Sequence, residues 1–301
     1  MKIMRFNSSH RTSIAVNDGS GWIDYGAILE YQGISLTALE IDADQFIIHL
    51  LKSGELEPEI IRNNIDIFNT DNESFSIQEN ELTPILPLRP GKVVCVARNW
   101  EDHAKEGGHN LPENPVIFVK TDNCPIGPNE PIFAPSDLGR VDHEGELGVV
   151  IGRKVSRVKA DSALKYVHSY TIVNDVTARA HQRMLADHGW PWFVAKSMDN
   201  SAPIGPWLVT PDEAEPLDGK RIRVTVNGEL RQNGSLDDMH WKIPELIEAI
   251  SRYITLNVGD VIATGTPSGV GPIQEGDIVE VTINGIGVLT NPVSDPSKDN
   301  R

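Results

Sequence analysis

Apolar positions in the first 80 residues form short runs that predict both strands and helices. Short strands are predicted around Thr12–Val16 and Ile28–Tyr31, where apolar residues cluster. A helix with Gly54 as its C-cap is predicted next, because apolar residues recur there near the 3.6-residue period. These residues are Leu36, Leu39, Phe46, Ile47, Leu50 and Leu51. Pro58 is suited to open a second short helix that runs through Ile67.

Three prolines separate this first part from the rest of the chain. The segment Thr83–Pro90 contains Pro84, Pro87 and Pro90, and this density of proline predicts an extended linker. We therefore predict two domains, a small N-terminal domain of residues 1–82 and a larger domain of residues 83–301.

From Gly91 onward the pattern becomes that of β-structure. The pairs Asn227-Gly228 and Asn284-Gly285 follow alternating or β-branched runs, which predicts two hairpins. Between them Pro244 is expected to open a helix whose apolar face comprises Leu246, Ile247, Ile250 and Ile254. Further strands are predicted at Lys92–Ala97, Val116–Val119 and Leu147–Ile151. The predicted fold class is α+β and β-rich, with a mixed sheet structure and few helices.

Composition excludes several classes of protein. The 301 residues carry 27 basic and 43 acidic side chains, and a net charge of −16 would repel nucleic-acid phosphates and anionic membranes. No apolar run approaches the roughly 18–20 residues that span a bilayer, and the start, MKIMRFNSSH, lacks the apolar region of a signal peptide. Two cysteines, Cys95 and Cys124, form neither a disulfide framework nor a CxxC zinc motif. We expect a cytoplasmic protein that binds neither nucleic acid nor membrane.

The negative charge is unevenly distributed. Residues 1–80 hold 5 basic and 13 acidic residues, whereas residues 91–210 hold 13 basic and 14 acidic residues. An anionic ligand is therefore tolerated best in this nearly neutral middle of the chain.

The sharpest local pattern is VDHEGELGVVIG, residues 141–152. Glu144 and Glu146 are two residues apart, so in a strand their side chains point to one face, about 6–7 Å apart. Their mutual repulsion would be removed by a divalent cation that prefers hard oxygen ligands, such as Mg²⁺, Mn²⁺ or Ca²⁺. The alternative is a solvated strand edge. Asp175, at the end of an apolar strand in YTIVNDVTAR, is a third candidate ligand, and its alternative role is a helix N-cap.

A second candidate lies in GKVVCVARNWEDHAKEGG, residues 91–108. If Asp102–Glu106 is helical, His103 and Glu106 face each other at i and i+3. A carboxylate that holds one imidazole nitrogen leaves the other free as a base near neutral pH. Gly107-Gly108 would then give hinge freedom to a loop that closes over a site. The alternative is a polar surface turn.

Cations also gather in the neutral middle, namely Arg98, Lys120, Arg179 and Lys196. Lys196 has unusually apolar neighbours, so desolvation is expected to lower its pKa and to favour a catalytic or oxyanion-binding role. The alternative is a snorkelling lysine at a strand edge. The loop GTPSGVG, residues 265–271, lacks the GK[ST] of a phosphate loop and the first glycine of a nucleophile elbow, which excludes both.

Eight ordered segments together resemble the fumarylacetoacetate hydrolase family over roughly residues 85–293. They are CVARNWEDHAKE, PVIFVK, VDHEGELGVVIG, NDVTARAHQ, AKSMDNSAPIGPW, VNGELRQNG, GDVIATGTPSGVG and the closing pattern from Gly276. The N-terminal part resembles the variable N-terminal domain of that family only loosely.

The resemblance implies a mixed β-sandwich roll with the active site at its mouth. It implies Mg²⁺ or Mn²⁺ held by Glu144, Glu146 and Asp175, and a mobile lid on which His103 and Glu106 activate a water. It also implies that the substrate is bound or polarised by Lys196, Arg179, Gln182 and Thr266, and we add Arg98 to these candidates. Family members are commonly homodimers.

The predicted function is therefore metal-dependent hydrolysis of a C–C bond in a small 2,4-diketo acid of the acylpyruvate type. The alternative at the same site is isomerisation, tautomerisation or decarboxylation of a related 2-oxo acid, for which metal polarisation alone suffices. A non-catalytic protein that binds a metal or metabolite would have been indicated by loss of His103, Glu106 or Lys196, and all three are present.

Overall fold

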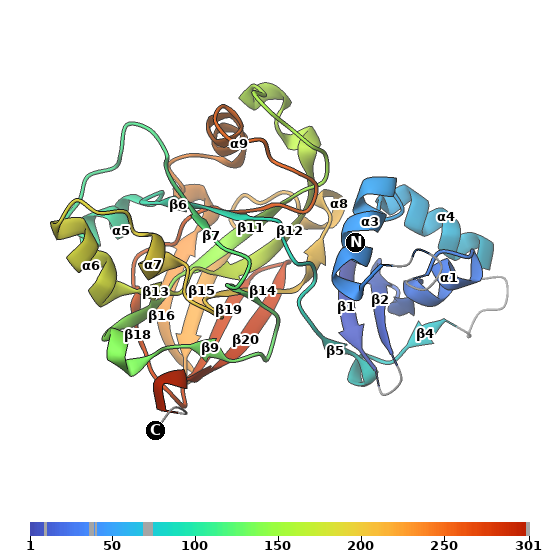
Figure 1. Ribbon diagram of the computed structural model, residues 1–301. Helices are drawn as coiled ribbons and strands as arrows, with labels where there is room; N and C mark the ends of the chain where they lie inside the picture. The colour runs from blue at the N-terminus through green and yellow to red at the C-terminus, as the bar shows by residue number, and fades with distance from the viewer. Residues whose placement is uncertain (9–10, 36–38, 40, 69–74, 299–301) are drawn as a thin grey trace.

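Strands dominate the chain from residue 93 onward, whereas helices and short strands form the described residues of the N-terminal part (Figure 1). The computed structural model describes residues 1–8, 11–35, 39, 41–68 and 75–298. The helices are α1 (Tyr25–Tyr31), α3 (Ala43–Ser53), α4 (Pro58–Phe68), α5 (Glu101–Glu106), α6 (Arg179–Asp187), α7 (Phe193–Lys196), α8 (Pro211–Ala214) and α9 (Ile243–Ser251).

One large sheet runs through both parts of the chain. Its central strands β14, β12 and β11 are antiparallel neighbours. Strand β1 of the N-terminal part pairs with β14, where Lys2 lies opposite Val209 and Ile3 lies opposite Leu208. In order, its strands are β4 (Ser76–Ile77), β3 (Trp22–Asp24), β2 (Thr12–Asn17), β1 (Lys2–Asn7), β14 (Ala202–Val209), β12 (Val167–Asn174), β11 (Gly145–Ile151), β17 (Val261–Ala263), β6 (Val93–Ala97) and β7 (Val116–Lys120). Two short strands join off this path, β5 (Thr83–Pro84) beside β1 and β8 (Pro125–Ile126) beside β14.

The described residues also form two smaller sheets. The five-stranded one contains both predicted hairpins, and its order is β16 (Glu229–Ser235), β15 (Arg221–Val226), β19 (Ile278–Ile283), β20 (Gly287–Ser294) and β9 (Ile132–Phe133). The three-stranded one is β13 (Thr177–Ala178), β10 (Val141–His143) and β18 (Gly271–Ile273). The predicted β-rich, mixed-sheet fold with few helices is confirmed.

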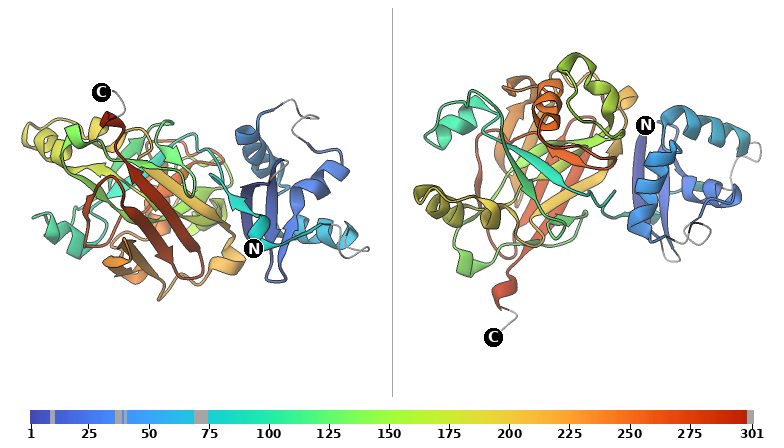
Figure 2. Two further views of the ribbon diagram at one scale, coloured as in Figure 1. Left: turned by 90° about the horizontal axis from the view of Figure 1, so that it is seen from below. Right: turned by 45° about the horizontal axis from the view of Figure 1, so that its top comes forward.

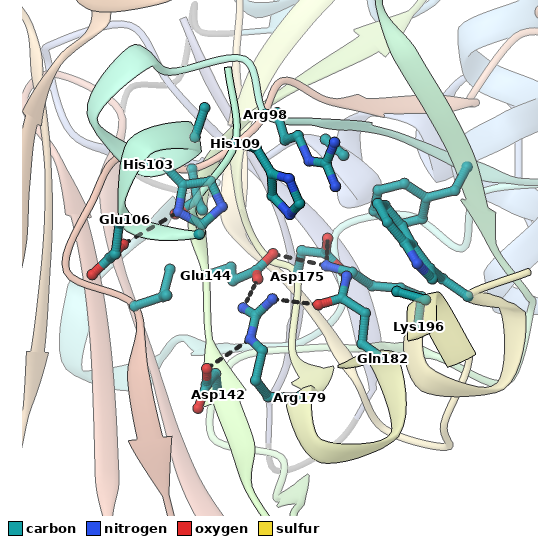
Figure 3. Close-up of a pocket in the computed structure, with 18 of the residues that line it drawn as sticks. Arg98, His103, Glu106, His109, Asp142, Glu144, Asp175, Arg179, Gln182 and Lys196 are labelled. Carbon is teal, nitrogen blue, oxygen red and sulfur yellow. Dashed lines mark hydrogen bonds and ion pairs between the residues drawn. The ribbon is translucent and has the colours of Figure 1, made fainter. Parts of the chain in front are cut away.

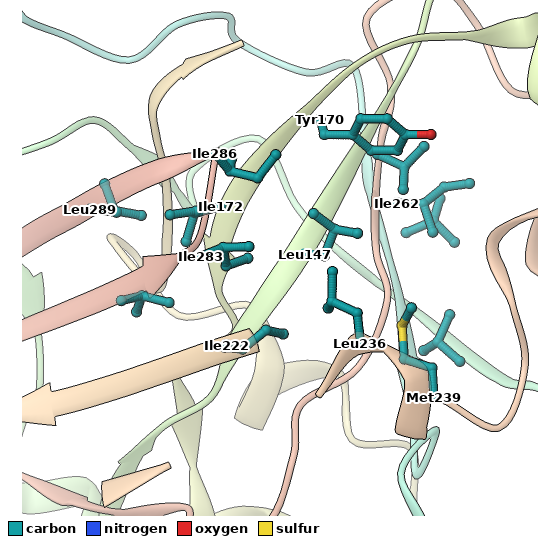
Figure 4. Close-up of a cluster of buried hydrophobic side chains, with 14 of the residues drawn as sticks. Leu147, Tyr170, Ile172, Ile222, Leu236, Met239, Ile262, Ile283, Ile286 and Leu289 are labelled. Carbon is teal, nitrogen blue, oxygen red and sulfur yellow. The ribbon is translucent and has the colours of Figure 1, made fainter. Parts of the chain in front are cut away.

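The core lies on both faces of the large sheet. On one face the five-stranded sheet packs against it, and Leu147 and Ile172 meet Ile222, Ile283 and Leu289 (Figure 4). On the other face a second cluster joins the sheet to the N-terminal helices. Figure 2 shows that the helices and strands of the N-terminal part gather at one end of the molecule. Apolar side chains on both faces make the central strands almost continuously hydrophobic, which explains the unbroken runs in the sequence.

The strand and turn predictions for the larger part hold well. Asn227 and Gly228 both have positive φ, 52° and 78°, as a two-residue hairpin turn requires. The second hairpin turns at Gly285, with φ 75°. Helix α9 begins with Pro244 in its first turn and buries Leu246, Ile247 and Ile250 as predicted, while Ile254 follows the helix and packs on the same cluster.

In the N-terminal part, one prediction is wrong. Ile28–Tyr31 belongs to helix α1 and not to a strand, because Asp24 caps the helix by accepting a hydrogen bond from the Ala27 amide. A short apolar run does not distinguish a buried strand from a buried helix turn.

The two helices predicted after α1 are present. Helix α3 begins after the N-cap Asp42 and ends at Gly54, which has the left-handed conformation of a C-cap. Helix α4 begins at Pro58 as predicted. Leu39 precedes α3, and Leu36 lies outside the described residues.

The segment between residues 83 and 90 connects the two parts and is anchored by side chains. Leu86 and Leu88 are buried in the cluster shared with the N-terminal helices. The domain boundary between residues 82 and 83 stays a prediction. Within the described part of the chain, no helix has both the length and the apolar character needed to cross a bilayer.

A methyl group added at Gly145 is expected to disturb the contact between the sheets. Its Cβ would lie 2.5 Å from Val224 Cγ2 and 2.9 Å from Val281 Cγ1. Overpacking of this kind costs about 1–3 kcal/mol, so Gly145→Ala should lower the free energy of unfolding in urea by that amount. Lys154→Ala, at an exposed position, is the control and should change it by less than about 0.5 kcal/mol. Equal stability of the two variants would contradict this packing.

Buried His168 is expected to make the protein acid-sensitive. Its Nε2 contacts the Leu56 carbonyl at 3.0 Å, and burial lowers the pKa of His168 below 6.5, so the unfolded chain binds the proton more tightly than the folded one. Stability should therefore be retained above about pH 6.5 and fall as the pH drops below it. His168→Gln keeps a donor for Leu56 but cannot titrate, so urea unfolding between pH 7 and 5 should show a shallower loss of stability. His188→Gln, at an exposed histidine, should follow the original protein, and an unchanged slope in His168→Gln would refute the prediction.

Candidate active site

A cavity of about 480 Å³ opens where the segment after β6, the β10–β11 strands and helices α6 and α7 converge (Figure 3). All the predicted site residues line it, although they come from five separate segments of the chain. They are Arg98, His103, Glu106, Glu144, Glu146, Asp175, Arg179, Gln182, Lys196 and Thr266. The structure thus brings the whole predicted set together, and the individual roles stay predictions.

Three buried carboxylates form the floor of the cavity. Glu144 and Glu146 flank Gly145 at the start of β11, and Asp175 follows the neighbouring strand β12. The Asp175 amide donates to the Glu144 carbonyl at 2.8 Å, which brings the ends of the two strands together. One oxygen from each carboxylate lies within 4.8 Å of the others, and none of the three residues is more than 4% exposed. Neither a solvated edge nor a helix N-cap describes these residues, because helix α6 begins only at Arg179.

The carboxylates differ in how their charge is compensated. Burial raises the pKa of Glu146 well above 4.5, and the charges of Asp175 and Glu144 raise it further. Burial would also raise the pKa of Glu144, but the positive charges of Lys196 and Arg179 outweigh it, and its pKa is lowered. Glu146 is therefore the carboxylate with the least compensation.

This donor set fits a hard divalent cation. Three carboxylates within reach of one centre, with an open side toward the cavity, match the preference of Mg²⁺ and Mn²⁺ for oxygen ligands and retained water. Burial first, and the charges of Asp175 and Glu144 in addition, raise the pKa of Glu146, and a divalent cation beside it would favour its ionised form. Glu144, Glu146 and Asp175 are the residues that would hold such an ion.

Lys196 is buried against these carboxylates. It ends helix α7, is 3% exposed, and its Nζ donates to Glu144 Oε2 at 2.8 Å, Asp175 Oδ2 at 2.7 Å and Thr177 Oγ1 at 2.6 Å. The predicted lowering of its pKa is wrong. Burial alone would lower the pKa of Lys196, but the charges of Asp175 and Glu144 outweigh burial and raise it. The snorkelling alternative is also wrong, because Lys196 lies on a helix and is not solvated.

Lys120 supports the same cluster from behind. It is fully buried, and its Nζ lies 3.0 Å from Asp175 Oδ1 and donates to the Lys196 carbonyl at 2.6 Å. It thus holds Asp175 and the end of α7 in place without lining the cavity.

Arg179 binds the cluster from its other side. Its guanidinium pairs with Glu144 and hydrogen-bonds to Gln182, and its Nε donates to Asp142 Oδ2 at 2.8 Å. Asp142 was not identified from the sequence, although it precedes Glu144 by two residues in VDHEGEL and so lies at the same strand spacing. Asp142 orients Arg179 toward Glu144.

The predicted His–Glu pair forms on helix α5. His103 Nδ1 lies 3.4 Å from Glu106 Oε2, on the wall of the cavity (Figure 3). Both Glu106 oxygens also lie 3.2 Å from the Gly269 amide, so α5 is tied to the loop after β17. The hydrogen bond from His103 lowers the pKa of Glu106 despite partial burial. Glu106 is therefore ionised and can orient the His103 ring.

Gly107 and Gly108 cap helix α5, and the hinge predicted for them stays a prediction. Gly108, with φ 75°, ends α5 in the left-handed conformation, and its amide donates to the Lys105 carbonyl. The next amide, that of His109, donates to the Ala104 carbonyl at 2.8 Å. This is the Schellman pattern of a capped helix, which fixes the chain direction after α5.

Thr266 reaches the cavity through a network that the sequence did not reveal. Its Oγ1 donates to the Gly145 carbonyl at 2.8 Å and accepts from Gln232 Nε2 at 2.7 Å. Gln232 is fully buried, and its Oε1 accepts from the Gly145 amide at 3.1 Å. Gln232 therefore links the loop of Thr266 to the strand of the carboxylates.

Comparison with known proteins agrees with this geometry. The family description "Fumarylacetoacetate (FAA) hydrolase C-terminal" matches residues 92–294. The chain belongs to the fumarylacetoacetate hydrolase family.

Its relatives carry the names of different activities. The mitochondrial oxaloacetate tautomerase fahd-1 of Caenorhabditis elegans is 44% identical over 189 residues, which is 63% of this chain and 88% of the relative. A fumarylacetoacetate hydrolase from Exiguobacterium antarcticum has a TM-score of 0.78 and 32% identity, covering 98% of this chain and 99% of that structure. A 5-carboxymethyl-2-hydroxymuconate delta-isomerase from Mycobacterium smegmatis has a TM-score of 0.73 and 34% identity, covering 98% and 99%. The family is therefore established, and the reaction is not fixed by similarity.

Glu146→Gln is expected to abolish tight binding of the divalent ion. The substitution keeps the shape of the side chain but removes the negative charge with the least compensation. Titration calorimetry of metal-free protein with Mn²⁺ should show a Kd raised at least about 100-fold, since even loss of an outer partner of a metal site costs 10–100-fold. Asp137→Asn removes an exposed carboxylate and should leave the Kd unchanged. Unaltered Mn²⁺ binding in Glu146→Gln would rule out this cluster as the metal site.

Proposed function

We propose that this chain is a divalent-metal-dependent hydrolase that cleaves a C–C bond in a small 2,4-diketo acid. The observation that carries the proposal is the His103–Glu106 pair on the cavity wall, above the carboxylate floor (Figure 3). Hydrolysis requires both a metal site and a separate acid–base group that face one cavity. A reaction driven by metal polarisation alone requires only the metal site. A volume of about 480 Å³ suits a small organic acid.

His103 is the base in this reaction. Because Nδ1 faces Glu106, Nε2 is the nitrogen available to accept a proton from a water in the cavity. The oxygen of that water adds to the carbonyl distal to the carboxylate, and the bond between this carbon and the adjacent methylene breaks. The products are a carboxylic acid and a pyruvate enolate, which takes up a proton at carbon. Mg²⁺ or Mn²⁺, when bound, supplies Lewis-acid polarisation of the substrate oxygens.

The cationic residues organise the floor of the site. All three Nζ–H groups of Lys196 are committed to Glu144, Asp175 and Thr177, so in this arrangement Lys196 binds the carboxylates and not a ligand. Its predicted role toward the substrate requires one of these hydrogen bonds to open. Arg179 and Gln182 lie at the cavity surface, where their N–H groups can donate hydrogen bonds to the substrate carboxylate.

The second candidate is tautomerisation of a small 2-oxo acid at the same site. It is favoured by the names of relatives, two of which are an oxaloacetate tautomerase and a muconate isomerase. In that reaction metal polarisation alone would promote the transfer of a proton between carbon and oxygen of the substrate, without His103 as a base and without consuming water. The predicted homodimer also stays a prediction.

His103→Ala separates the two candidates. Removal of a general base costs about 10²–10⁴-fold, so hydrolysis of acetylpyruvate, measured as pyruvate release with Mg²⁺ present, should fall by that factor. Metal-driven tautomerisation, followed as loss of the ultraviolet absorbance of the enol, should retain a larger fraction of its rate. Lys105→Ala lies on the outer face of α5, where Lys105 pairs with Glu101, and should change neither rate. Unchanged pyruvate release in His103→Ala would exclude the proposed hydrolytic mechanism.

A further inference from the structure

Strand β16 buries a polar side chain and exposes an apolar one, which reverses the usual preference. Gln232 is fully buried, whereas Leu230 is 53% exposed. The strand contains a β-bulge, in which Arg231 is an extra residue between Leu230 and Gln232, and this bulge turns Gln232 inward. Bulges re-aim side chains beside functional sites, and a position that breaks the polar and apolar pattern indicates a specific role.

The partners of the Gln232 amide fix its orientation. The Gly145 amide can only donate, and it donates to Gln232 Oε1 at 3.1 Å. The Pro267 carbonyl can only accept, and it accepts from Gln232 Nε2 at 2.7 Å. His143 Nδ1 also lies 3.1 Å from Oε1 and therefore carries the proton, while the second Nε2 hydrogen bond goes to Thr266. All four hydrogen-bonding positions of this buried amide are used.

Gln232 closes a ring of hydrogen bonds around Gly145. The Gly145 amide donates to Gln232 Oε1, Gln232 Nε2 donates to Thr266 Oγ1 at 2.7 Å, and this hydroxyl donates to the Gly145 carbonyl at 2.8 Å. Gly145 separates Glu144 from Glu146 on the strand that supplies the carboxylate floor. The ring therefore attaches the loop of Thr266 to the strand at the point from which both glutamates project.

The loop from Gly265 to Gly269, here the 265–269 loop, contacts two carboxylates of different function. The Gly265 amide donates to Glu146 Oε2 at 2.7 Å, and the Gly269 amide lies 3.2 Å from both oxygens of Glu106. Gln232 binds the loop between these two amides. A shift of the loop would therefore displace the partners of both carboxylates together.

Two glycines allow the 265–269 loop to lie directly against β16. A Cβ on Gly269 would lie 2.1 Å from the Arg231 carbonyl oxygen, and a Cβ on Gly234 would lie 2.5 Å from Pro267 Cβ. The loop thus contacts β16 on both sides of Gln232. Its position depends on the side chain that β16 places beneath it.

We propose that Gln232 is a positioning residue that sets the His103–Glu106 pair relative to the carboxylate floor. Gln232 binds the 265–269 loop, and the amides of that loop bind Glu106 on one side and the floor on the other. This rests on the proposed function, in which His103 presents its free nitrogen to a water beside the metal site. Gln232 is buried beneath Thr266, which lines the cavity, so it acts on the rate through placement and not through contact with substrate.

Gln232→Met tests this role, because it keeps the length of the side chain and removes its hydrogen bonds. In the hydrolysis of acetylpyruvate at saturating Mg²⁺, kcat should fall about 10- to 100-fold, the loss expected from small misplacement of a catalytic group. KM should change less than about 3-fold. Gln232→Glu keeps the oxygen that faces Gly145 but lacks the donors to the loop. It should lower kcat in the same way, so the test does not depend on the folding of one variant.

A double-mutant cycle with Glu106→Gln shows whether Gln232 acts through Glu106. If Gln232 supplies the placement of Glu106, Gln232→Met should lower kcat less than about 3-fold once Glu106 has been replaced. A purely structural role would give the same loss with and without Glu106. An equal loss in both backgrounds, or a loss carried by KM, disproves the proposal.

Asn291→Leu is the matched control. Asn291 is 2% exposed on β20 of the same sheet, and its Nδ2 donates to the carbonyls of Gly127 and Glu130 at 2.8 and 2.9 Å. This variant should lose stability in urea as Gln232→Met does, and leave kcat and KM unchanged. A comparable fall in kcat in Asn291→Leu would show that loss of any buried amide suffices, and would refute the specific role of Gln232.

Hydrogen–deuterium exchange of residues 265–271 measures the attachment of the loop without substrate. Exchange should be at least about 10-fold faster in Gln232→Met and unchanged in Asn291→Leu. Unchanged exchange in Gln232→Met refutes the proposal. If the original protein releases no pyruvate, the proposed function fails, and exchange alone then decides whether Gln232 fixes the loop.

Discussion

The site depends on the balance of charge around three buried carboxylates. One carboxylate oxygen from each of Glu144, Glu146 and Asp175 lies within 4.8 Å of the others, and none of the three residues is more than 4% exposed. At such distances and in a low dielectric, their repulsion would separate the strand ends that carry them. Lys196 and Arg179 attach Glu144 and Asp175 to neighbouring elements, and Glu146 remains without an ion pair among the described residues. A bound divalent cation would supply the charge that these contacts leave uncompensated.

Residues whose chemistry depends on local spacing could be predicted from the sequence. Glu144 and Glu146 share a face because strands repeat every two residues, and His103 meets Glu106 because one helical turn separates them. The same holds for the Asn-Gly hairpins. Identification of the whole set also needed the family resemblance, since the predicted residues reach the cavity from five segments distant in the chain.

Residues whose properties come from tertiary neighbours could not be predicted in this way. The apolar sequence around Lys196 indicated a lowered pKa, but the carboxylates that raise it arrive from β11 and from the end of β12. Gln232 looked like an ordinary hairpin residue, and only its burial beneath the Thr266 loop shows its role. His109 follows a glycine pair that resembled a hinge, and the capped end of α5 is what directs it to the cavity. In each case the sequence shows the residue but not its partner.

The pairing of β1 with β14 means that the N-terminal part covers an edge of β14 in the large sheet. Leu208 and Val209 are fully buried where Ile3 and Lys2 pair with them, and Met1 donates from its amino group to Thr210 beside them. Removal of residues 1–82 would convert this stretch of β14 into an open, hydrophobic strand edge, and such edges recruit strands from other molecules. A fragment confined to residues 92–294, the region that defines the family, would thus retain every cavity residue and still be prone to aggregate.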